Sequence, residues 1–585
     1  MSQAQKTPGS TLLASPLIAA LWEMRSTLVS VFAFSLVINF LMLAPSLYSL
    51  QVYDRVLTSR NMTTLLMLSL ITLFLFGVLS LVEWSRSRIM VRVGVRLDHV
   101  LGKRLLAAAH RLNIDQGSSA GRSLLGDLSK IRYFLTGPAM LAALDAPWVP
   151  IYFVVTMMLH PWLGLIALVS AVILSILTYV TELLTQHPLS RANAHAHEAR
   201  KISDVNQRNG EVVEAMGMLP ALTGRWQAAQ DGHLYEQARA SDRAAHVSSF
   251  THFFRLLQQG LILGAGAMLA VDGSLTPGGM IAGSILASRM MLPIEQLIAS
   301  WRQWIDAHEA WKRIDHALSL PEPGFSGVKL PAPKGEIFLE NVYAGPPGST
   351  TPTLKNITLR IPAGASVAVV GASAAGKSSL LRVLAGVWKP LNGLVRIDGA
   401  DMQHWPRADL GPHIGYLPQD VELFDGTVAE NICRHGELNS EAILAAAAAA
   451  GVDDIIRRLA QGYGTPVGSG GTFLSGGQRQ RIGLARALYG TPALVFLDEP
   501  NANLDEAGEL ALDGALKLAH ERGQTIVLVS HRPNAIRNCD LILMLQDGQV
   551  ALFGPRDLVL QSLANASAKT LPQQPPVVEN GHAPQ

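Results

Sequence analysis

The chain has 585 residues, enough for three or four domains of average size. Hydrophobic residues make up 49% and charged residues only 16%, against roughly 25% charged in soluble proteins. The mean hydropathy of +0.25 indicates a membrane protein. A net charge of +2 gives no support for a nucleic-acid partner, and two cysteines exclude a disulfide framework.

Apolar blocks dominate residues 26–315, after an N-terminal segment of residues 1–25 that we expect on the cytoplasmic side. A helix needs about twenty mostly apolar residues to cross a bilayer, and the first block is too long for a cleavable signal. Three blocks meet the length requirement cleanly and three more carry polar residues. We expect all six to span the membrane: 28–50, 65–82, 139–160, 162–180, 256–271 and 280–298.

The polar residues inside these blocks have two interpretations. Asp145, Gln258, Gln259 and Arg289 either line a hydrated translocation route through the spans, or lie near the interface and extend their polar ends into water. The sequence leaves both open.

Lysine and arginine residues in the connections give the orientation. Residues 86–137 hold ten of them and 184–250 hold seven, whereas the connections on the other side hold two, none and none. Positive residues gather on the cytoplasmic side. Both termini and the polar C-terminal half are therefore expected in the cytoplasm.

The C-terminal half is expected to be an α/β nucleotide-binding domain at 336–565, after a Pro- and Gly-rich linker at 316–335 and before a disordered tail at 566–585. "SVAVVGASAAGKSSLL" is a strand, a glycine loop and a helix that fit the phosphate-loop pattern. Its amides and lysine are expected to hold ATP phosphates, with Ser378 also on Mg²⁺. The residues of this loop are Gly371, Ala372, Ser373, Ala374, Ala375, Gly376, Lys377, Ser378 and Ser379.

Three further segments place acidic and polar groups after apolar strands. "ALVFLDEP" ends in Asp498, a candidate Mg²⁺ ligand, and in Glu499, a candidate general base for the attacking water. "TIVLVSH" ends in His531, a candidate contact for the γ-phosphate, and "YLPQD" supplies Gln419, a candidate ligand of Mg²⁺ and nucleotide.

These motifs, in this order and together with "LSGGQ" at 474–478, resemble the ATP-binding cassette family over residues 336–565. The resemblance implies that the signature caps the ATP held by a second cassette, so that two copies of the chain form a homodimer with shared sites. The implied signature contacts are Ser475, Gly476, Gly477 and Gln478. Adenine stacks on an aromatic residue in this family; the corresponding offset falls near Pro346, and Tyr343 is the nearest aromatic candidate.

Six spans followed by one cassette resemble a half-size ABC exporter, in which short cytoplasmic helices (here 113–126 and 209–219) couple the cassette to the spans. In the stretch that precedes the signature, the family's usual glutamate is replaced by Pro466.

Several stretches, among them "SLQVYDRVLTSRN", "DAPWVPIYFVV" and "LTPGGMIAGSILASRMMLPIEQLI", resemble type I secretion permease/ATPases, closest to the branch that exports proteases and repeat-in-toxin proteins. The short segment before the first span agrees with that branch, which lacks an N-terminal peptidase-like domain. The resemblance implies ATP-driven export of an unfolded polypeptide across a bacterial inner membrane, with a periplasmic adaptor and an outer-membrane tunnel protein. The alternatives are a lipid or small-molecule exporter of the same architecture and a soluble ABC ATPase, against which the spans argue.

Overall fold

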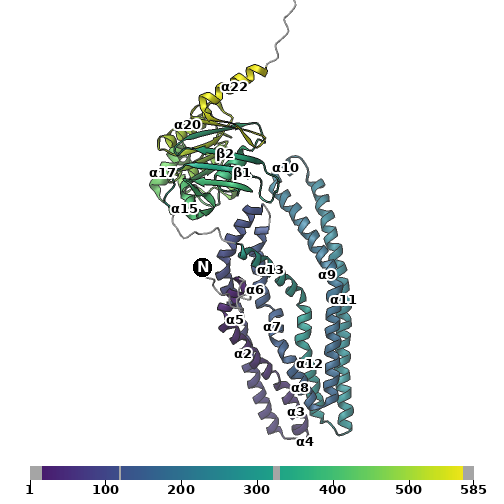
Figure 1. Ribbon diagram of the computed structural model, residues 1–585. Helices are drawn as coiled ribbons and strands as arrows, with labels where there is room; N and C mark the ends of the chain where they lie inside the picture. The colour runs from purple at the N-terminus through teal and green to yellow at the C-terminus, as the bar shows by residue number, and fades with distance from the viewer. Residues whose placement is uncertain (1–15, 117–119, 321–329, 571–585) are drawn as a thin grey trace, which may run out of the picture. The chain divides into compact units, whose positions relative to one another are not determined.

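The computed structural model describes residues 16–116, 120–320 and 330–570. The chain divides into a helical unit, residues 1–109 and 122–319, and an α/β unit, residues 110–121 and 320–585. All strands of the described residues lie in the α/β unit (Figure 1).

Six helical segments of the described chain are long and apolar enough to cross a membrane, which confirms the six predicted spans. They are Arg25–Ser59, Met62–Asp115, Pro138–Leu159, Pro161–Arg208, Leu219–Val271 and Pro277–Ala299. The helices α5 (Met62–Gln116), α9 (Pro161–Arg208) and α11 (Leu219–Val271) contain 55, 48 and 53 residues. That is more than twice the ~20 residues needed to cross hydrocarbon, so they continue beyond a bilayer.

Shorter elements complete the helical unit. The first span combines α2 (Arg25–Leu41), α3 (Ala44–Gln51), a π-helical turn (Val52–Val56) and α4 (Leu57–Ser59). The third combines α7 (Pro138–Asp145), a 3₁₀ turn (Ala146–Trp148) and α8 (Val149–Leu159), and the sixth is α12 (Pro277–Ala299). The other helices are α1 (Pro16–Glu23), α6 (Ala120–Thr136), α10 (Gly210–Ala215) and α13 (Trp301–Ser319).

Several element boundaries differ from those expected from the sequence. α13 runs to Ser319, four residues into the predicted linker, because its buried stripe continues through Ala310, Ile314 and Ala317. α10 lies inside 209–219, where a short helix was predicted. The other predicted coupling segment, 113–126, includes residues 117–119, which lie outside the described residues, as do 321–329 of the linker.

Side-chain exposure in the helical unit fits a lipid environment. Its core contains residues from α8, α9, α11 and α12, such as Tyr152, Leu163, Ala167, Ile262 and Ala287. By contrast, the N-terminal half of α5 exposes a row of large apolar side chains. Such a continuous apolar surface is rare on soluble proteins and is typical of a lipid-facing helix. The row contains Leu66, Met67, Leu70, Ile71, Leu73 and Phe74.

Asp145 lies among polar groups of the first two spans. Its carboxylate is 3.0 Å from the guanidinium of Arg86 and accepts a hydrogen bond of 2.8 Å from Asn39. Arg86 also donates to Ser35, and Tyr152 donates to the carbonyl of Asn39. Asp145 is therefore held in an internal polar network. Among the other polar span residues, Gln258 is buried, whereas Gln259 is exposed.

Two sheets form the α/β unit. The first has the antiparallel order β2-β1-β4-β5 and the second the order β10-β9-β3-β8-β7-β6, in which β3, β6, β7, β8 and β9 pair in parallel. β3 is thus central, which places the loop after it at the middle of the carboxyl edge. The strands are β1 (Ile337–Ala344), β2 (Leu354–Ile361), β3 (Ser366–Gly371), β4 (Asn392–Ile397), β5 (Ala400–Asp401), β6 (Ile414–Leu417), β7 (Leu494–Asp498), β8 (Thr525–Val529), β9 (Leu541–Gln546) and β10 (Gln549–Pro555).

Nine α-helices accompany these sheets within the described residues: α14 (Lys377–Leu384), α15 (Arg407–Leu410), α16 (Val428–Ile432), α17 (Ser440–Ala449), α18 (Asp453–Arg457), α19 (Gly476–Leu488), α20 (Glu506–Glu521), α21 (Pro533–Arg537) and α22 (Arg556–Thr570). α22 extends to Thr570, so the first five residues of the predicted disordered tail are helical; residues 571–585 lie outside the described residues.

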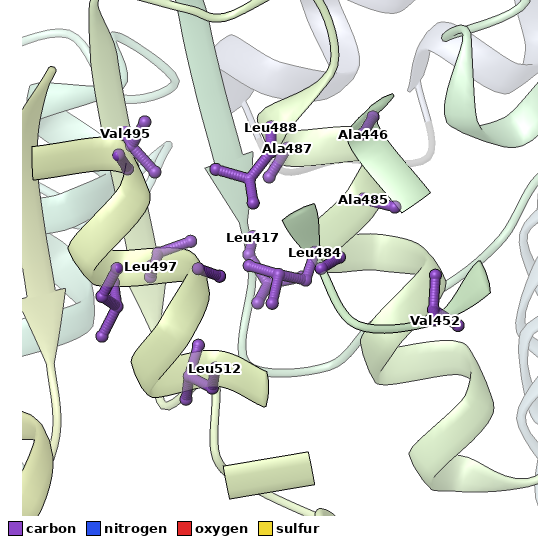
Figure 2. Close-up of a cluster of buried hydrophobic side chains, with 14 of the residues drawn as sticks. Leu417, Ala446, Val452, Leu484, Ala485, Ala487, Leu488, Val495, Leu497 and Leu512 are labelled. Atoms are coloured by element: carbon purple, nitrogen blue, oxygen red, sulfur yellow. The ribbon is translucent and has the colours of Figure 1, made fainter. Parts of the chain in front are cut away.

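β7 is buried along its whole length and separates two apolar cores. Val495 and Leu497 face the core that contains Leu484, Leu488 and Leu512 (Figure 2). Leu494 and Phe496 alternate with them and contact the other core, between the two sheets. Packing on both faces fixes the strand and therefore the position of Asp498, its last residue.

Candidate functional site

The phosphate loop connects β3 to α14, and its backbone needs glycine at both ends. Gly371 and Gly376 have φ of +152° and +98°, and a Cβ at Gly371 would lie 2.4 Å from the carbonyl oxygen of Leu545. Between them, Ala372, Ser373 and Ala374 are exposed, and Ala374 also has positive φ at 66°. This curved loop at a helix N-terminus presents exposed backbone, as a phosphate cradle requires.

Lys377 is fixed above this loop. Its side chain is largely buried, and Nζ donates hydrogen bonds to the carbonyls of Gly371 at 2.9 Å and Ala372 at 3.0 Å. The ammonium is therefore already at the mouth of the loop, where it adds positive charge for an anion. Ala375 is buried beneath the loop, and Ser379 lies in the first turn of α14, half-buried.

Ser378 and Asp498 form the predicted metal-binding pair. The hydroxyl of Ser378 donates to Oδ1 of Asp498 at 3.1 Å, and Asp498 is almost completely buried at the end of β7. Burial raises the pKa of Asp498 above its usual 3.8, and the charge of Glu499 acts in the same direction, whereas the hydrogen bond from Ser378 opposes them. A hydroxyl and a carboxylate are hard oxygen ligands, so these two side chains fit Mg²⁺ that is shared with nucleotide phosphates.

Glu499 lies at the centre of a row of three polar side chains. Its Oε2 accepts a hydrogen bond of 3.2 Å from Nε2 of Gln419, and its Oε1 is 3.7 Å from Nε2 of His531. Its backbone has φ of 48° and donates to the carbonyl of Val529 at 3.0 Å. The row forms because the parallel strands β6, β7 and β8 end at the same edge of the sheet.

The signature segment builds a separate site. Ser475 caps α19: its hydroxyl accepts from the amide of Gln478 at 3.2 Å, and the side chain of Gln478 accepts from the Ser475 amide at 2.9 Å. Gly476 and Gly477 form the first turn behind this capping box, and Ser475, Gly477 and Gln478 line an open groove of about 470 Å³. In the described residues no hydrogen bond or ion pair joins this groove to the phosphate loop of the same chain.

Comparison with known proteins identifies the family. Residues 28–294 match the ABC transporter transmembrane region and residues 354–502 match the ABC transporter ATPase family. The type I secretion system ATP-binding protein PrsD of Rhizobium meliloti is 41% identical over 93% of this chain and 94% of its own length. This chain belongs to the ABC transporter family.

A second relative and a solved structure agree with that assignment. The leukotoxin translocation ATP-binding protein LktB of Mannheimia haemolytica is 29% identical to the transporter over 93% of this chain and 78% of its own length. A bacterial Atm1-family ABC exporter with ATP bound has the same fold, with a TM-score of 0.81, 21% identity, and coverage of 94% of this chain and 99% of the other. The transporter is thus a multi-pass membrane protein with an ATP-hydrolysing unit.

Tyr343, the candidate for adenine stacking, lies on β1 of the transporter. Tyr343 lies on β1 between Val342 and Ala344, which are buried, so its ring is on the opposite face of the strand, half-buried. Its carbonyl accepts from Leu391 at 2.7 Å, and no hydrogen bond in the described residues joins its side chain to the loop. A role in adenine stacking stays a prediction.

Sequence reasoning missed four polar residues that line the signature groove of the transporter. Arg481 forms an ion pair with Asp505, and Arg458 and Asn503 complete that side of the groove. One signal was available: Ser475, Gln478 and Arg481 recur every three residues, a spacing that places side chains on one face of a helix.

Proposed function

We propose that this transporter exports an unfolded polypeptide as the permease/ATPase of a type I secretion system in a bacterial inner membrane. The observation that carries the proposal is the end-to-end similarity to PrsD, a type I secretion system protein, at 41% identity over 93% of the chain. LktB, a leukotoxin translocation protein, supports the same class of cargo. The proposed partners are a second copy of the chain, a periplasmic adaptor, an outer-membrane tunnel protein and the secreted polypeptide.

The proposed domains follow the chain: a transmembrane domain at 26–315, a linker at 316–335 and an ATP-binding cassette at 336–565. The excess of lysine and arginine in residues 86–137 and 184–250 supports a cytoplasmic position for the cassette.

In the proposed mechanism, the phosphate loop and Lys377 bind the phosphates of ATP, and Ser378 and Asp498 hold Mg²⁺ with Gln419 nearby. When bound, Mg²⁺ supplies positive charge that neutralises the phosphate oxygens. Glu499 accepts a hydrogen bond from the attacking water and orients it, held between Gln419 and His531. His531 is half exposed and directs its imidazole toward the same space.

The signature groove supports a two-copy site, because it lies at a helix N-terminus, where an anion is stabilised, and no hydrogen bond or ion pair of the described residues joins it to the phosphate loop of its own chain. In the proposed dimer, Ser475 and Gly477 of one copy complete the nucleotide site of the other. A C2 pair then contains two equivalent sites.

A complementation experiment tests the shared site. Lys377→Ala and Ser475→Ala are each expected to abolish ATP hydrolysis in pure form. Mixed in one dimer, they leave one intact site, with the phosphate loop of one chain and the signature of the other, and hydrolysis returns. If each chain used its own signature, the mixture would stay inactive.

The exported substance is tested by proteomics of the culture medium. Glu499→Gln is expected to remove one or a few proteins from the medium and to retain them in the cells. The matched control is Glu506→Gln, an exposed glutamate at the start of α20. An unchanged set of secreted proteins would contradict polypeptide export and favour a lipid or small-molecule exporter.

A further inference from the structure

A cavity of about 210 Å³ lies inside the helical unit, far along the chain from any residue of the nucleotide site. It is bounded by α9, α11 and the junction of α12 with α13 (Figure 1 shows these helices). We call it the junction pocket, and its lining includes Glu182, Gln186, Gln237, Ala244, Trp301 and Arg302.

Small residues and a helix break create this space. Ala240, which is buried, and Ala244 lie one turn apart on α11 and leave room opposite α9. α12 ends at Ala299, and the hydroxyl of Ser300 bonds to the carbonyl of Gln296 at 2.6 Å, a contact that bends helices. α13 then begins with Trp301, whose ring forms part of the pocket wall and is 37% exposed.

Four polar side chains of the junction pocket are open to a ligand, whereas the hydroxyls of Thr181 and Thr185 already donate to backbone carbonyls. Among the described residues, neither Glu182 nor Arg302 has an ion-pair partner, and neither Gln186 nor Gln237 has a hydrogen-bond partner for its amide.

Two polar contacts beside the pocket join α9 to α11. Arg191 lies 3.7 Å from Glu236, and Arg243 donates to the carbonyl of Leu184 at 3.0 Å. The two helices are therefore joined by polar contacts beside the pocket, while the groups that line it keep their bonding capacity.

The level of the pocket along the helices suits a molecule that enters from the cytoplasmic side. At 1.5 Å per residue, Glu182 lies roughly 32 Å along α9 from Pro161, and Arg302 roughly 38 Å along α12 and α13 from Pro277. The hydrocarbon core is about 30 Å thick. Measured from Pro161 and Pro277, the distance to Glu182 is close to that thickness and the distance to Arg302 exceeds it, so that both charged groups are expected at or outside the edge of the core, where an ionised side chain is tolerated.

The geometry points to a binding site for an extended segment of the exported polypeptide, with one large apolar side chain inserted between α9, α11 and α13. A cavity of ~150 Å³ holds a benzene ring, so 210 Å³ accepts one such side chain. The amides of Gln186 and Gln237 each offer donors and an acceptor that match the main chain of an unfolded segment. Glu182 and Arg302 together carry no net charge, so the pocket selects for neither acidic nor basic cargo.

This inference rests on the proposed function, because it requires a polypeptide as cargo. Its test uses the purified full-length transporter in detergent and a dye-labelled ten-residue Gly/Ser peptide with one central Phe. Binding is followed by fluorescence anisotropy, beside the same peptide with Asp in place of Phe. The Phe peptide is expected to bind at least about tenfold more tightly, since the pocket wall is mostly apolar.

Filling the pocket is expected to abolish this preference. Ala244→Phe occupies the cavity, and the matched control Ala245→Phe alters the next residue, which is exposed and outside the lining. Gln237→Leu keeps the cavity and removes the amide. This change is expected to weaken binding of the Phe peptide about three- to tenfold. ATP hydrolysis without peptide is expected to be unchanged in all three and shows that they fold.

Equal binding of the Phe and Asp peptides, or unchanged binding by both Ala244→Phe and Gln237→Leu, would overturn the inference. So would a phospholipid that copurifies with the wild type but not with Ala244→Phe, because a lipid headgroup would then be the occupant. The secretion experiment with Glu499→Gln separates the two proposals. If this variant loses cargo from the medium while Ala244→Phe and Gln237→Leu bind the Phe peptide as the wild type does, only the pocket is refuted. If the medium contains no protein whose secretion is lost in Glu499→Gln, the proposed function is refuted.

Discussion

Arg86 and Asp145, 59 positions apart in sequence, form an ion pair of 3.0 Å inside the helical unit. The Arg86 side chain is 8% exposed and that of Asp145 is 19% exposed, and Asn39 and Ser35 complete their hydrogen bonds. The pair thereby joins the first three spans. A charge left alone in such a site is far more destabilising than a satisfied pair is stabilising.

Arg86→Leu is therefore expected to lower the unfolding free energy of the helical unit by about 3–5 kcal/mol, because it leaves Asp145 uncompensated. The double variant Arg86→Leu/Asp145→Leu is expected to recover much of that loss. The control is Arg88→Leu, an exposed neighbour in contact with the ring of Trp84. Apparent melting temperatures in detergent measure all three, and a double variant less stable than Arg86→Leu would contradict the expectation.

The ion pair between Asp127 and Arg313 predicts a pH dependence. Burial acts to raise the pKa of Asp127, but the hydrogen bonds from Arg313 and Lys130 outweigh it, so the net pKa lies below the usual 3.8. A carboxylate with a lowered folded-state pKa stabilises the fold fully at pH values above its unfolded-state pKa. That contribution is lost as the pH falls through the folded-state pKa.

Arg313→Ala is thus expected to lower the melting temperature at pH 7, with a difference from wild type that shrinks below about pH 4. Lys130→Ala is the control: its side chain is 53% exposed, and such a contact contributes at most about 1 kcal/mol. A difference between Arg313→Ala and wild type that is the same at pH 3 and pH 7 would count against this assignment.

The proposed role of Asp498 as a Mg²⁺ ligand predicts a cost in stability. Its buried carboxylate adjoins Glu499, and its only direct hydrogen-bond donor among the described side chains is Ser378. Asp498→Asn removes the buried charge, so the nucleotide-free protein is expected to melt a few degrees higher than wild type. The same variant is expected to lose ATP hydrolysis. Calorimetry without metal, followed by an ATPase assay with Mg²⁺, tests both; a lower melting temperature would refute the reasoning.

The N-terminal end of α12 fits closely against the first span. The carboxylate of Asp54 accepts a hydrogen bond of 2.8 Å from the amide of Gly278 and one of 2.7 Å from the hydroxyl of Thr276. A Cβ on Gly278 would lie 2.6 Å from both Asp54 Oδ1 and the carbonyl oxygen of Leu50. Gly278→Ala is therefore expected to lose about 1–3 kcal/mol of stability. Gly264→Ala, where nothing lies within 4 Å of the new Cβ, is the control in a parallel melting experiment, and equal melting temperatures would contradict the packing argument.

Local patterns in the sequence were enough to predict the spans, the phosphate loop and the acidic residues that follow the strands. Six apolar blocks predicted six spans because a bilayer imposes a length and an apolar composition on each helix. The phosphate loop and the acidic ends of the strands were equally readable, because the backbone requirements of Gly371 and Gly376 and the apolar run before Asp498 lie within a few neighbouring residues.

Only the tertiary structure decided how distant residues meet. No local pattern indicated that Asp145 pairs with Arg86, or that small residues of α11 and the break at Ser300 leave a pocket. Periodicity fixes which residues share one face of a helix or strand. The partner of that face is set by the packing of segments far apart in the chain, which depends on shape and burial and not on neighbours in sequence.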